Sequence, residues 1–441
     1  MKITKYLQQQ TPIIHFQHDQ TGATLRATEV KPKLDRWIIE RGKEMGKYEP
    51  SWLKPMPQGS KIRALDYSLK ILPTDSSQTY RWRTTDEYIG KDKEGRDIRK
   101  TQSNAPLYLG DQGSNTPINT KGLIFNEATL RLTFMCANAS LKDFIEDELT
   151  AFFFRYNFGT RQNKGYGSFV LVDNDQSKEP IIPQEFKSHP FLKFEIDKNY
   201  WQPNKNSKPS KHTIKGEWSR TKWELDLQKN NHPEFTHKQF YFYLFEVIRW
   251  YYQTLKSGIT AKNSTDSYLN KYANDKHKIQ WGKFWIQKNI IGNNIVIPSD
   301  YQVKLLRILL GFADRYEYPQ FDGKPQVFVR HLEEPKKRIS RVKSPITFKP
   351  VVQGEKVTVY LILDDELIEA INTRVLKEKF VLGSKEETPE KDESNVLSAP
   401  DQPIDFADLM KQYHQHLGNR FNASDFTGKY IIPVTIKNPE A

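Results

Sequence analysis

Alternating apolar and polar positions predict two strands in the first third of the chain. Residues 63–71 (RALDYSLKI) place four apolar side chains on one face, namely Leu65, Tyr67, Leu69 and Ile71. Residues 127–134 (EATLRLTF) do the same with Ala128, Leu130, Leu132 and Phe134. A period of two is typical of a half-buried strand. Two shorter apolar runs, residues 11–16 (TPIIHF) and 168–172 (SFVLV), are predicted to be strands as well.

A helical period predicts two helices between these strands. The stripe of the first consists of Val30, Leu34, Trp37, Ile38 and Arg41. Since proline is tolerated only in the first turn, this helix is expected to begin near Pro32. The second is expected to begin at an N-cap, Ser140, with Asp143 in an acidic variant of the capping box. Its apolar stripe consists of Leu141, Phe144, Ile145, Leu149, Phe152 and Phe153.

Taken in order, residues 11–173 read strand, helix, strand, strand, helix, glycine-rich loop and strand. This is the order of a βαββαβ ferredoxin-like unit. Further along, strands are predicted at 191–197 and 357–363, and helices at 239–255, 302–313 and 364–376. This alternation permits a second unit of the same kind. The predicted fold class is therefore α+β, with two ferredoxin-like (RRM-like) domains in tandem and helical insertions.

Composition along the chain sets the expected domain boundaries. Residues 80–120 are polar and contain several glycines, which is typical of a long insertion. Residues 383–403 are acidic, with three prolines and few apolar side chains, and predict a flexible linker. We expect a first domain at 1–180, a second at 181–382, and a C-terminal helix and strand within 404–441.

The charge of the chain adds a preference for polyanions. Its 441 residues carry a formal net charge of +13, and 12% of them are aromatic. A folded basic protein attracts nucleic acid first and an acidic membrane surface second. Cys136 is the only cysteine, which excludes an internal disulfide and any multi-cysteine metal site. No window approaches the ~20 apolar residues of a membrane helix and no signal peptide is visible, so we expect a cytoplasmic protein.

Residues 158–169 (FGTRQNKGYGSF) concentrate candidate chemistry in one loop. Glycines permit positive φ and close backbone approach, and the N–H groups of such a loop can hold phosphate oxygens. Basic side chains add charge, and tyrosines can stack on bases. The candidate RNA-binding residues in and beside the loop are Arg155, Gly159, Arg161, Lys164, Gly165, Tyr166 and Gly167, with Tyr156 as a further ring. The alternative is a tight turn with solvated charges.

Two other basic segments are candidates for phosphate contacts. Arg26, Lys31, Lys33 and Arg36 surround the start of the first helix, and helix N-termini favour phosphate. In a ferredoxin-like unit this segment is expected on the same side as the glycine loop, so both would clasp one phosphodiester chain. The alternative is a surface helix of balanced charge. In the second half, Arg338, Arg341 and Lys343 form a basic run whose alternative is a solubilising strand edge.

A catalytic alternative rests on a single histidine. His15 ends the first predicted strand, where it would act as the general acid or base of a metal-independent ribonuclease. The competing interpretation is a packed, hydrogen-bonded histidine. His414 and His416 are two residues apart on a predicted helix, the wrong spacing for one face. With no HExxH motif and no cluster of carboxylates, we expect no metal and no cofactor.

Several of these segments resemble the RAMP superfamily, the RNA-binding subunits of CRISPR ribonucleoproteins. FGTRQNKGYGSF is similar to that family's glycine loop, and TPIIHFQ with GATLRATEVKPKLDRW to its first strand, basic loop and first helix. LLRILLGF (305–312) and RISRVKSPITFKPV (338–351) resemble the late segment of tandem-domain members. Because a long stretch follows the glycine loop, the chain most resembles the tandem-RAMP subunit of the type III-B (Cmr) effector complex.

The resemblance implies an RNA-binding role and no catalysis. The expected partners are CRISPR guide RNA, target RNA and other subunits of a type III effector complex, with contacts near the 3′ end of the guide and no membrane. Two alternatives stay open. One is a metal-independent endoribonuclease that processes guide RNA, and the other is a scaffold that contacts only protein partners.

Overall fold

The computed structural model shows an α+β protein built from two compact units. The first unit comprises Met1–Arg249, Phe348–Leu361 and Gly418–Ala441, and the second comprises Trp250–Thr347 and Ile362–Leu417. The predicted domain boundaries stay predictions. The residues that the structure describes are 1–15, 24–55, 64–76, 79–83, 85–91, 94–103, 122–177, 179–187, 192–197, 233–256, 267–292, 302–311, 315–317, 326–334, 343–354, 356–376, 378–384, 396–421 and 434–435.

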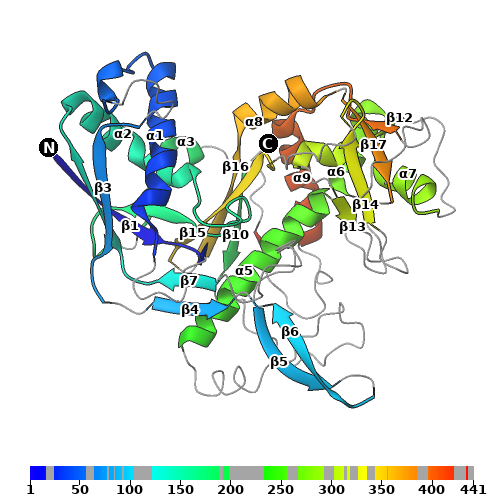
Figure 1. Cartoon of the computed structure of the whole chain (residues 1–441), viewed down its shortest axis with the longest axis horizontal. Helices are drawn as coiled ribbons and strands as arrows, with labels where there is room; N and C mark the ends of the chain where they lie inside the picture. The colour runs from blue at the N-terminus through cyan, green and yellow to red at the C-terminus, as the bar shows by residue number, and fades with distance from the viewer. Residues whose placement is uncertain are drawn as a thin grey trace. The chain divides into compact units, whose positions relative to one another are not determined.

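An apolar core in the first unit lies between four antiparallel strands and two helices. The strands are β1 (Lys2–Gln9), β3 (Tyr67–Pro73), β8 (Leu130–Cys136) and β9 (Phe169–Val172), in the order β3-β8-β1-β9. The helices α1 (Ala27–Glu44) and α2 (Ala139–Arg155) pack against one face of this sheet (Figure 1). Both predicted helical stripes are confirmed, because their apolar residues lie in this core.

The first strand of this sheet is not the one that the sequence predicts. We expected residues 11–16 there, but β1 begins at Lys2, and Ile13–His15 forms β2 in another sheet. The prediction was wrong because β1 ends in buried glutamines, which hide it from an apolar count. Gln9 Nε2 donates to the Ile124 carbonyl at 2.9 Å, and its Oε1 accepts from the Asn126 N–H at 3.0 Å.

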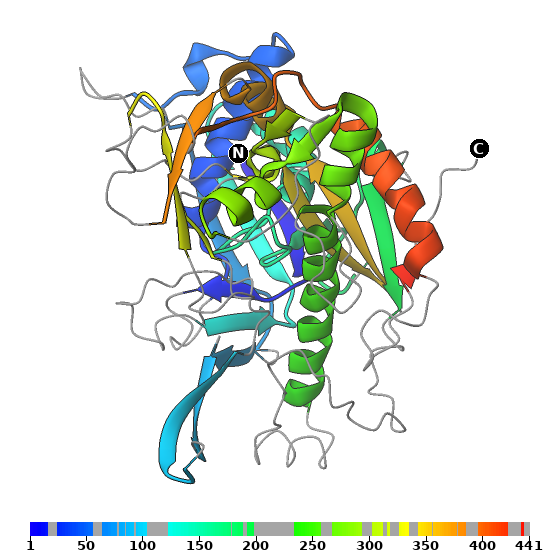
Figure 2. The same ribbon diagram turned by 90° about the vertical axis from the view of Figure 1, so that its right-hand side faces the viewer.

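The other strands of the first unit form smaller assemblies. One sheet has the order β2-β7-β4, with β4 (Thr79–Arg83) and β7 (Gly122–Asn126). The ribbon of β5 (Thr85–Lys91) and β6 (Asp97–Ser103) is a long twisted hairpin (Figure 2). The strands β5 and β6 lie within the insertion predicted at residues 80–120. Residues 104–121 lie outside the described part of the structure. A further sheet has the order β15-β16-β10-β19, made of β15 (Ile346–Gln353), β16 (Lys356–Leu363), β10 (Lys193–Asp197) and β19 (Val434–Thr435).

The second unit contains a sheet of order β13-β14-β17-β18 and a parallel pair, β11–β12. Its strands are β11 (Ile279–Trp281), β12 (Gln302–Lys304), β13 (Arg315–Glu317), β14 (Gln326–His331), β17 (Lys379–Gly383) and β18 (Val396–Ser398). Its helices are α6 (Tyr268–His277), α7 (Gly282–Asn289), α8 (Asp365–Ala370) and α9 (Phe406–Phe421). The described residues also form short helices. In the first unit these are η1 (Pro50–Trp52) and α3 (Gln184–Lys187), and in the second they are the 3-10 helix η5 (Leu306–Leu310) and the π-helical η6 (Ile371–Val375).

Later helix predictions have mixed outcomes. The aromatic helix is confirmed as α5 (Pro233–Lys256). The helix predicted at 302–313 is wrong, because β12 and η5 occupy the described part of it. Leu305, Leu306 and Ile308–Leu310 are all buried, and periodicity does not distinguish a wholly buried run from a helix. Ser140 is not the N-cap of α2, because the Asn138 side chain accepts from the Leu141 N–H at 3.0 Å.

Among the described residues, no helix combines the length and apolar character that a membrane crossing requires.

Candidate nucleic-acid interface

The glycine loop links α2 to β9 as a tightly folded turn. Gly159, Arg161, Gly165 and Gly167 all have positive φ, between 63° and 87°. A Cβ atom at Gly167 would lie 1.9 Å from the Phe158 carbonyl oxygen. The glycines are therefore required by contacts within the first unit, before any ligand is considered.

Backbone N–H groups of the loop already have acceptors in the protein. Gly159 donates to the Glu29 carboxylate, and Gly167 donates to the Pro12 carbonyl at 2.9 Å. Thr160 donates to the Ile14 carbonyl at 3.2 Å. The expectation that these peptide groups hold phosphate is therefore wrong for the loop as it is folded here.

The start of α1 meets the glycine loop, as the sequence predicts. Lys33 Nζ donates to Gln162 Oε1 at 2.7 Å and to the Asn157 carbonyl at 3.0 Å. It also lies 4.8 Å from the centre of the Phe158 ring. This contact fixes the loop against the helix, so the Lys33 charge serves the internal structure.

The four cations predicted at the start of the first helix, Arg26, Lys31, Lys33 and Arg36, do not form a single surface. Lys31 and Lys33 differ by about 200° around the helix axis, so they point to different sides of α1. Lys31 Nζ pairs with Asp35 at 2.9 Å and lies 3.8 Å from the centre of the Tyr67 ring. Burial lowers the pKa of Lys31, although the hydrogen bond and charge of Asp35 oppose that shift. Arg26, the N-cap of α1, is half-buried.

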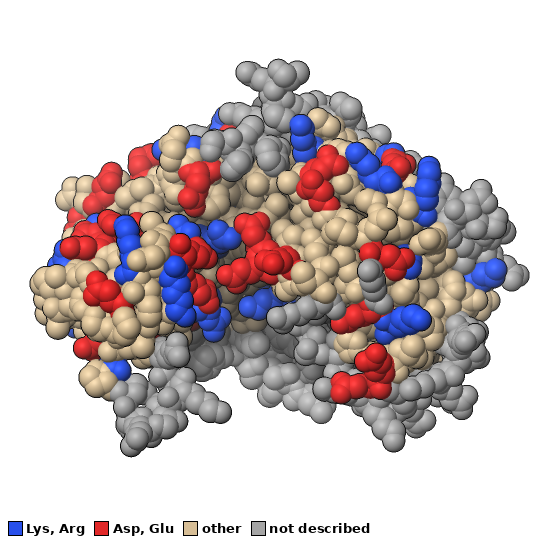
Figure 3. Space-filling view, turned by 90° about the horizontal axis from the view of Figure 1, so that it is seen from above, with Lys and Arg blue, Asp and Glu red and all other residues tan. Residues whose placement is uncertain are grey.

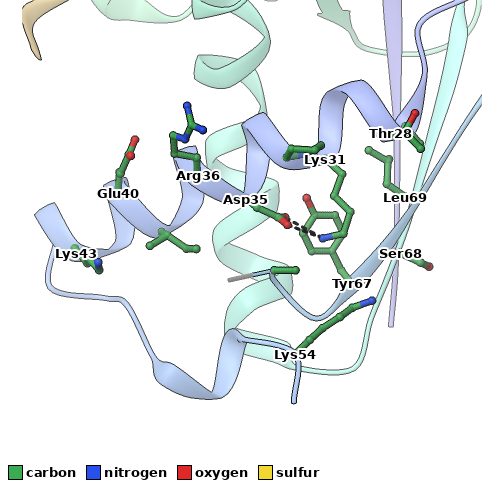
Figure 4. Close-up of a pocket in the computed structure, with 14 residues that line it drawn as sticks. Thr28, Lys31, Asp35, Arg36, Glu40, Lys43, Lys54, Tyr67, Ser68 and Leu69 are labelled. Atoms are coloured by element: carbon green, nitrogen blue, oxygen red, sulfur yellow. Dashed lines mark hydrogen bonds and ion pairs between the residues drawn. The ribbon is translucent and has the colours of Figure 1, made fainter. Parts of the chain in front are cut away.

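An open pocket lies beside Lys31, between α1 and β3, with a volume of about 790 Å³. Figure 4 shows Lys31 extending over Tyr67 next to Asp35, while Arg36 points away from this ion pair. Arg36 and Lys54 are exposed. The lining residues are Ala27, Thr28, Lys31, Pro32, Asp35, Arg36, Ile39, Glu40, Lys43, Lys54, Ala64, Tyr67, Ser68 and Leu69.

Other predicted loop residues are packed rather than exposed. Tyr166 is fully buried, and its ring stacks on Phe245 with centroids 3.6 Å apart, so the expectation that it stacks on bases is wrong. Lys164 Nζ is shielded from solvent. The Arg155 guanidinium lies 5.8 Å from the centre of the Trp37 ring. Arg161 is half-buried and is the loop cation with positive φ.

Lys349 is a structural residue that the sequence did not single out. Its side chain is fully buried in the first unit, and Nζ donates to the carbonyls of Phe153, Tyr156 and Phe169 at 2.7, 3.0 and 2.8 Å. Burial, and secondarily the charge of Lys33, lower the pKa of Lys349 well below its usual range. The only sequence signal was a basic run, which favours a solvated surface.

In the second unit, residue 311 of the segment 305–312 meets residue 344 of the segment 338–351, and both segments carried the resemblance to tandem-domain members. Gly311 ends η5 with a φ of 90°, and a Cβ atom there would lie 2.9 Å from the Ser344 backbone nitrogen. Lys256 Nζ donates to the Gly311 carbonyl at 2.7 Å. Lys343 is exposed beside this contact, whereas Arg338 and Arg341 lie outside the described residues.

The structure leaves the catalytic alternative open. His15 ends β2 opposite Gly122, and its side chain lies outside the described part of the structure. Within that described part, no group of three or more His, Cys, Asp or Glu is arranged to hold a metal ion. Figure 3 shows acidic and basic side chains interspersed over the face seen from above, so the net charge is not concentrated there.

Two family models together match most of the chain. The Cmr1 N-terminal domain matches residues 1–259, and the Cmr1 C-terminal domain matches residues 264–437. No curated protein matches the sequence.

Solved structures with similarity include two chains of type III-B Cmr-beta complexes and Cmr1 from Pyrococcus furiosus. The first, from a complex bound to cognate target RNA, is 13% identical over 39% of this chain and 58% of that chain, with a TM-score of 0.25. The Pyrococcus protein, in apo form, is 10% identical over 99% of this chain and 98% of that one, with a TM-score of 0.33. The third, from a complex with target RNA and AMPPnP in the presence of ssDNA, is 12% identical over 81% of this chain and 93% of that chain, with a TM-score of 0.34.

This chain therefore spans just over half the length of the first of these chains. At such TM-scores, the solved structures add no argument to the family models. Because the N-terminal model alone covers more than half of the residues, the chain belongs to the Cmr1 family, and its resemblance to a subunit of the type III-B (Cmr) CRISPR effector complex is confirmed.

Proposed function

We propose that this chain is an RNA-binding structural subunit of a type III-B CRISPR effector, acting in antiviral defence. The match of both Cmr1 domain models along the chain carries this proposal. The partners that this proposal implies are RNA and other subunits of the effector complex. Contact with guide and target RNA near the guide 3′ end belongs to the same proposal.

We infer that the first unit contains a ferredoxin-like RAMP domain. The order β3-β8-β1-β9 with antiparallel neighbours, and α1 and α2 on one face, supports this inference. A second RAMP-like domain later in the chain is supported by the match of the C-terminal family model and by the contact of Gly311 with Ser344. The fold class proposed for the whole chain is thus two such domains in tandem.

The RNA-binding residues that we propose are the accessible cations near α1 and the loop. Arg36 and Lys54 are exposed at the pocket, and Arg26 and Arg161 are half-buried. Lys343 is the accessible candidate of the second unit. Lys33, Lys164 and Tyr166 are assigned instead to the support of the loop, because their side chains are held or shielded inside the first unit.

Co-purification from the native host tests the proposal. A tagged full-length chain is isolated under native conditions, its bound RNA is sequenced and its bound proteins are identified. Short RNAs of one repeat-spacer pattern, together with several other subunits, are the expected result. Protein partners without RNA would favour the scaffold, and clean protein with neither would overturn the proposed function.

We propose no catalytic step for this chain. The endoribonuclease alternative is tested by incubating the purified wild type and a His15→Ala variant with a repeat-containing RNA. The proposal expects neither protein to cleave it. Cleavage by the wild type that His15→Ala abolishes, with RNA binding unchanged, would establish the enzyme instead.

A further inference from the structure

On the face of the main sheet opposite α1 and α2, nine side chains from three strands are exposed or half-buried. The outward positions of β1, β8 and β3 align in three cross-strand rows. In the order β1, β8, β3, the rows are Lys2–Met135–Ser68, Thr4–Thr133–Lys70 and Tyr6–Arg131–Leu72. We name these nine residues the open sheet face. Their neighbours along each strand, such as Ile3, Leu132 and Tyr67, point into the core.

The open sheet face is partly apolar. Met135 has 52% of its surface exposed and Leu72 has 40%, and both belong to the few large apolar side chains exposed among the described residues. Met135 lies on the central strand β8 in one outer row, Leu72 lies on β3 in the other outer row, and the row of Thr133 separates them. Uncovered antiparallel sheets usually expose polar side chains, so two large apolar ones on one small face favour a contact surface.

All the charge on the open sheet face has one sign. Lys2, Lys70 and Arg131 are exposed there, and none of the nine positions is acidic. A second copy of the chain that docked through the same face would bring these cations together. Self-association through this face is therefore disfavoured, and an occupant with negative charge is favoured.

Single-stranded RNA fits this face less well than a protein does. RNA on a sheet is bound largely by aromatic rings that stack on bases. Tyr6 is the single aromatic residue among the nine, and it is half-buried. Met135 and Leu72 instead provide flexible apolar surface, and methionine and arginine are enriched where proteins meet.

We propose that the open sheet face is a protein–protein interface, whose partner presents an apolar centre flanked by Asp and Glu. This inference rests on the proposed function, because the partner is taken to be another subunit of the effector complex. It assigns a surface and a chemistry to that contact. RNA binding remains with the accessible cations proposed above.

Site-specific photo-crosslinking in the native host tests the interface. A benzoylphenylalanine is placed at position 135 of the tagged full-length chain, and at position 45 as a control. Met45 is similarly exposed, with 45% of its surface accessible, but it caps α1 on the other side of the sheet. The expected result is a crosslink from position 135 to an acidic segment of one effector subunit, and none to that segment from position 45.

A charge-reversal pair completes the test. Arg131→Glu should lower the amount of that subunit recovered with the chain by about tenfold. Changing an acidic residue in the crosslinked segment of the partner to lysine should restore the amount of that subunit recovered with the Arg131→Glu variant. A crosslink from position 135 to RNA, no crosslink at all, or no effect of Arg131→Glu would overturn the inference. If guide RNA still co-purifies in those cases, the interface fails while the proposed function stands.

Discussion

The Nζ atom of Lys349 lies 2.7 Å from the carbonyl oxygen of Phe153, a residue 196 positions earlier in the chain. The same ammonium group donates to Tyr156 and Phe169, which lie before and after the glycine loop. The last carbonyls of α2 lack partners within the helix, and a cation there also complements the helix dipole. Lys349 thus holds the two ends of the loop together.

Replacing Lys349 should loosen the glycine loop. Lys349→Met leaves three buried carbonyls without their donor, which we expect to cost about 2–4 kcal/mol. Hydrogen exchange of peptides from residues 150–170 measures the effect locally, without assuming that two units unfold together. The control is Lys356→Met, because the Lys356 side chain is 60% exposed and its pair with Glu195 is a surface contact. Equal exchange in both variants would refute the role of Lys349.

Gly167 and Gly46 form a matched pair, because both have a φ of +67°. At Gly46 an added Cβ atom meets nothing within 4 Å, so Gly46→Ala should cost only the ~1–2 kcal/mol of an alanine at positive φ. Gly167→Ala adds a collision with the Phe158 carbonyl, and we expect a distinctly lower melting temperature. Thermal unfolding of the two variants measures the difference. Similar melting temperatures would show that the loop backbone is not held as described.

His414 should make the second unit sensitive to acid. Its ring is buried against Tyr251, and burial lowers its pKa from 6.5 to about 4. Between these two values the unfolded chain binds more protons, so the free energy of unfolding falls as the pH drops. The slope is about 1.4 kcal/mol per pH unit and the total about 3 kcal/mol, and the contribution is retained above pH 6.5.

Urea unfolding at pH 7.5 and pH 5, monitored by exchange of α9 peptides, checks this window. His414→Gln removes the titrating group and keeps a polar partner for Tyr251, so its stability should change less between the two pH values than that of the wild type. If both proteins lose the same stability, another group causes the acid sensitivity.

Features set by local periodicity were predictable from the sequence, and those set by distant partners were not. The stripes of α1 and α2 follow the helical repeat, so both helices and their buried faces were found. The strand β1 was missed because Gln9 satisfies its amide through Ile124 and Asn126, far along the chain. Lys349 stands in a basic run, and only its three carbonyl partners make it a buried residue.

In the candidate site, too, local sequence features were predictable and contacts with distant residues were not. Charge and glycine content identified the loop and the start of α1, and Lys33 with Gln162 confirms that they meet. Which cations stay accessible depended on side-chain packing. Tyr166 stacks on Phe245 in α5, and no local pattern around residue 166 indicates that contact.

The salt dependence of RNA binding by the full-length chain tests the proposed RNA contacts most directly. Fluorescence anisotropy with a mixed-sequence single-stranded RNA is measured for the wild type and for a variant with Arg36→Glu, Lys54→Glu and Arg161→Glu. The control variant carries Lys271→Glu, Lys276→Glu and Lys356→Glu, the same change in charge at exposed sites elsewhere.

We expect weaker binding for the first variant only. Its slope of log affinity against log salt should be shallower by about 2, since each phosphate contact on a single strand contributes about 0.7. An equal loss in both variants would mean that net charge alone attracts RNA. Unchanged binding in the first variant would contradict the assignment of RNA contacts to the α1 side of the first unit.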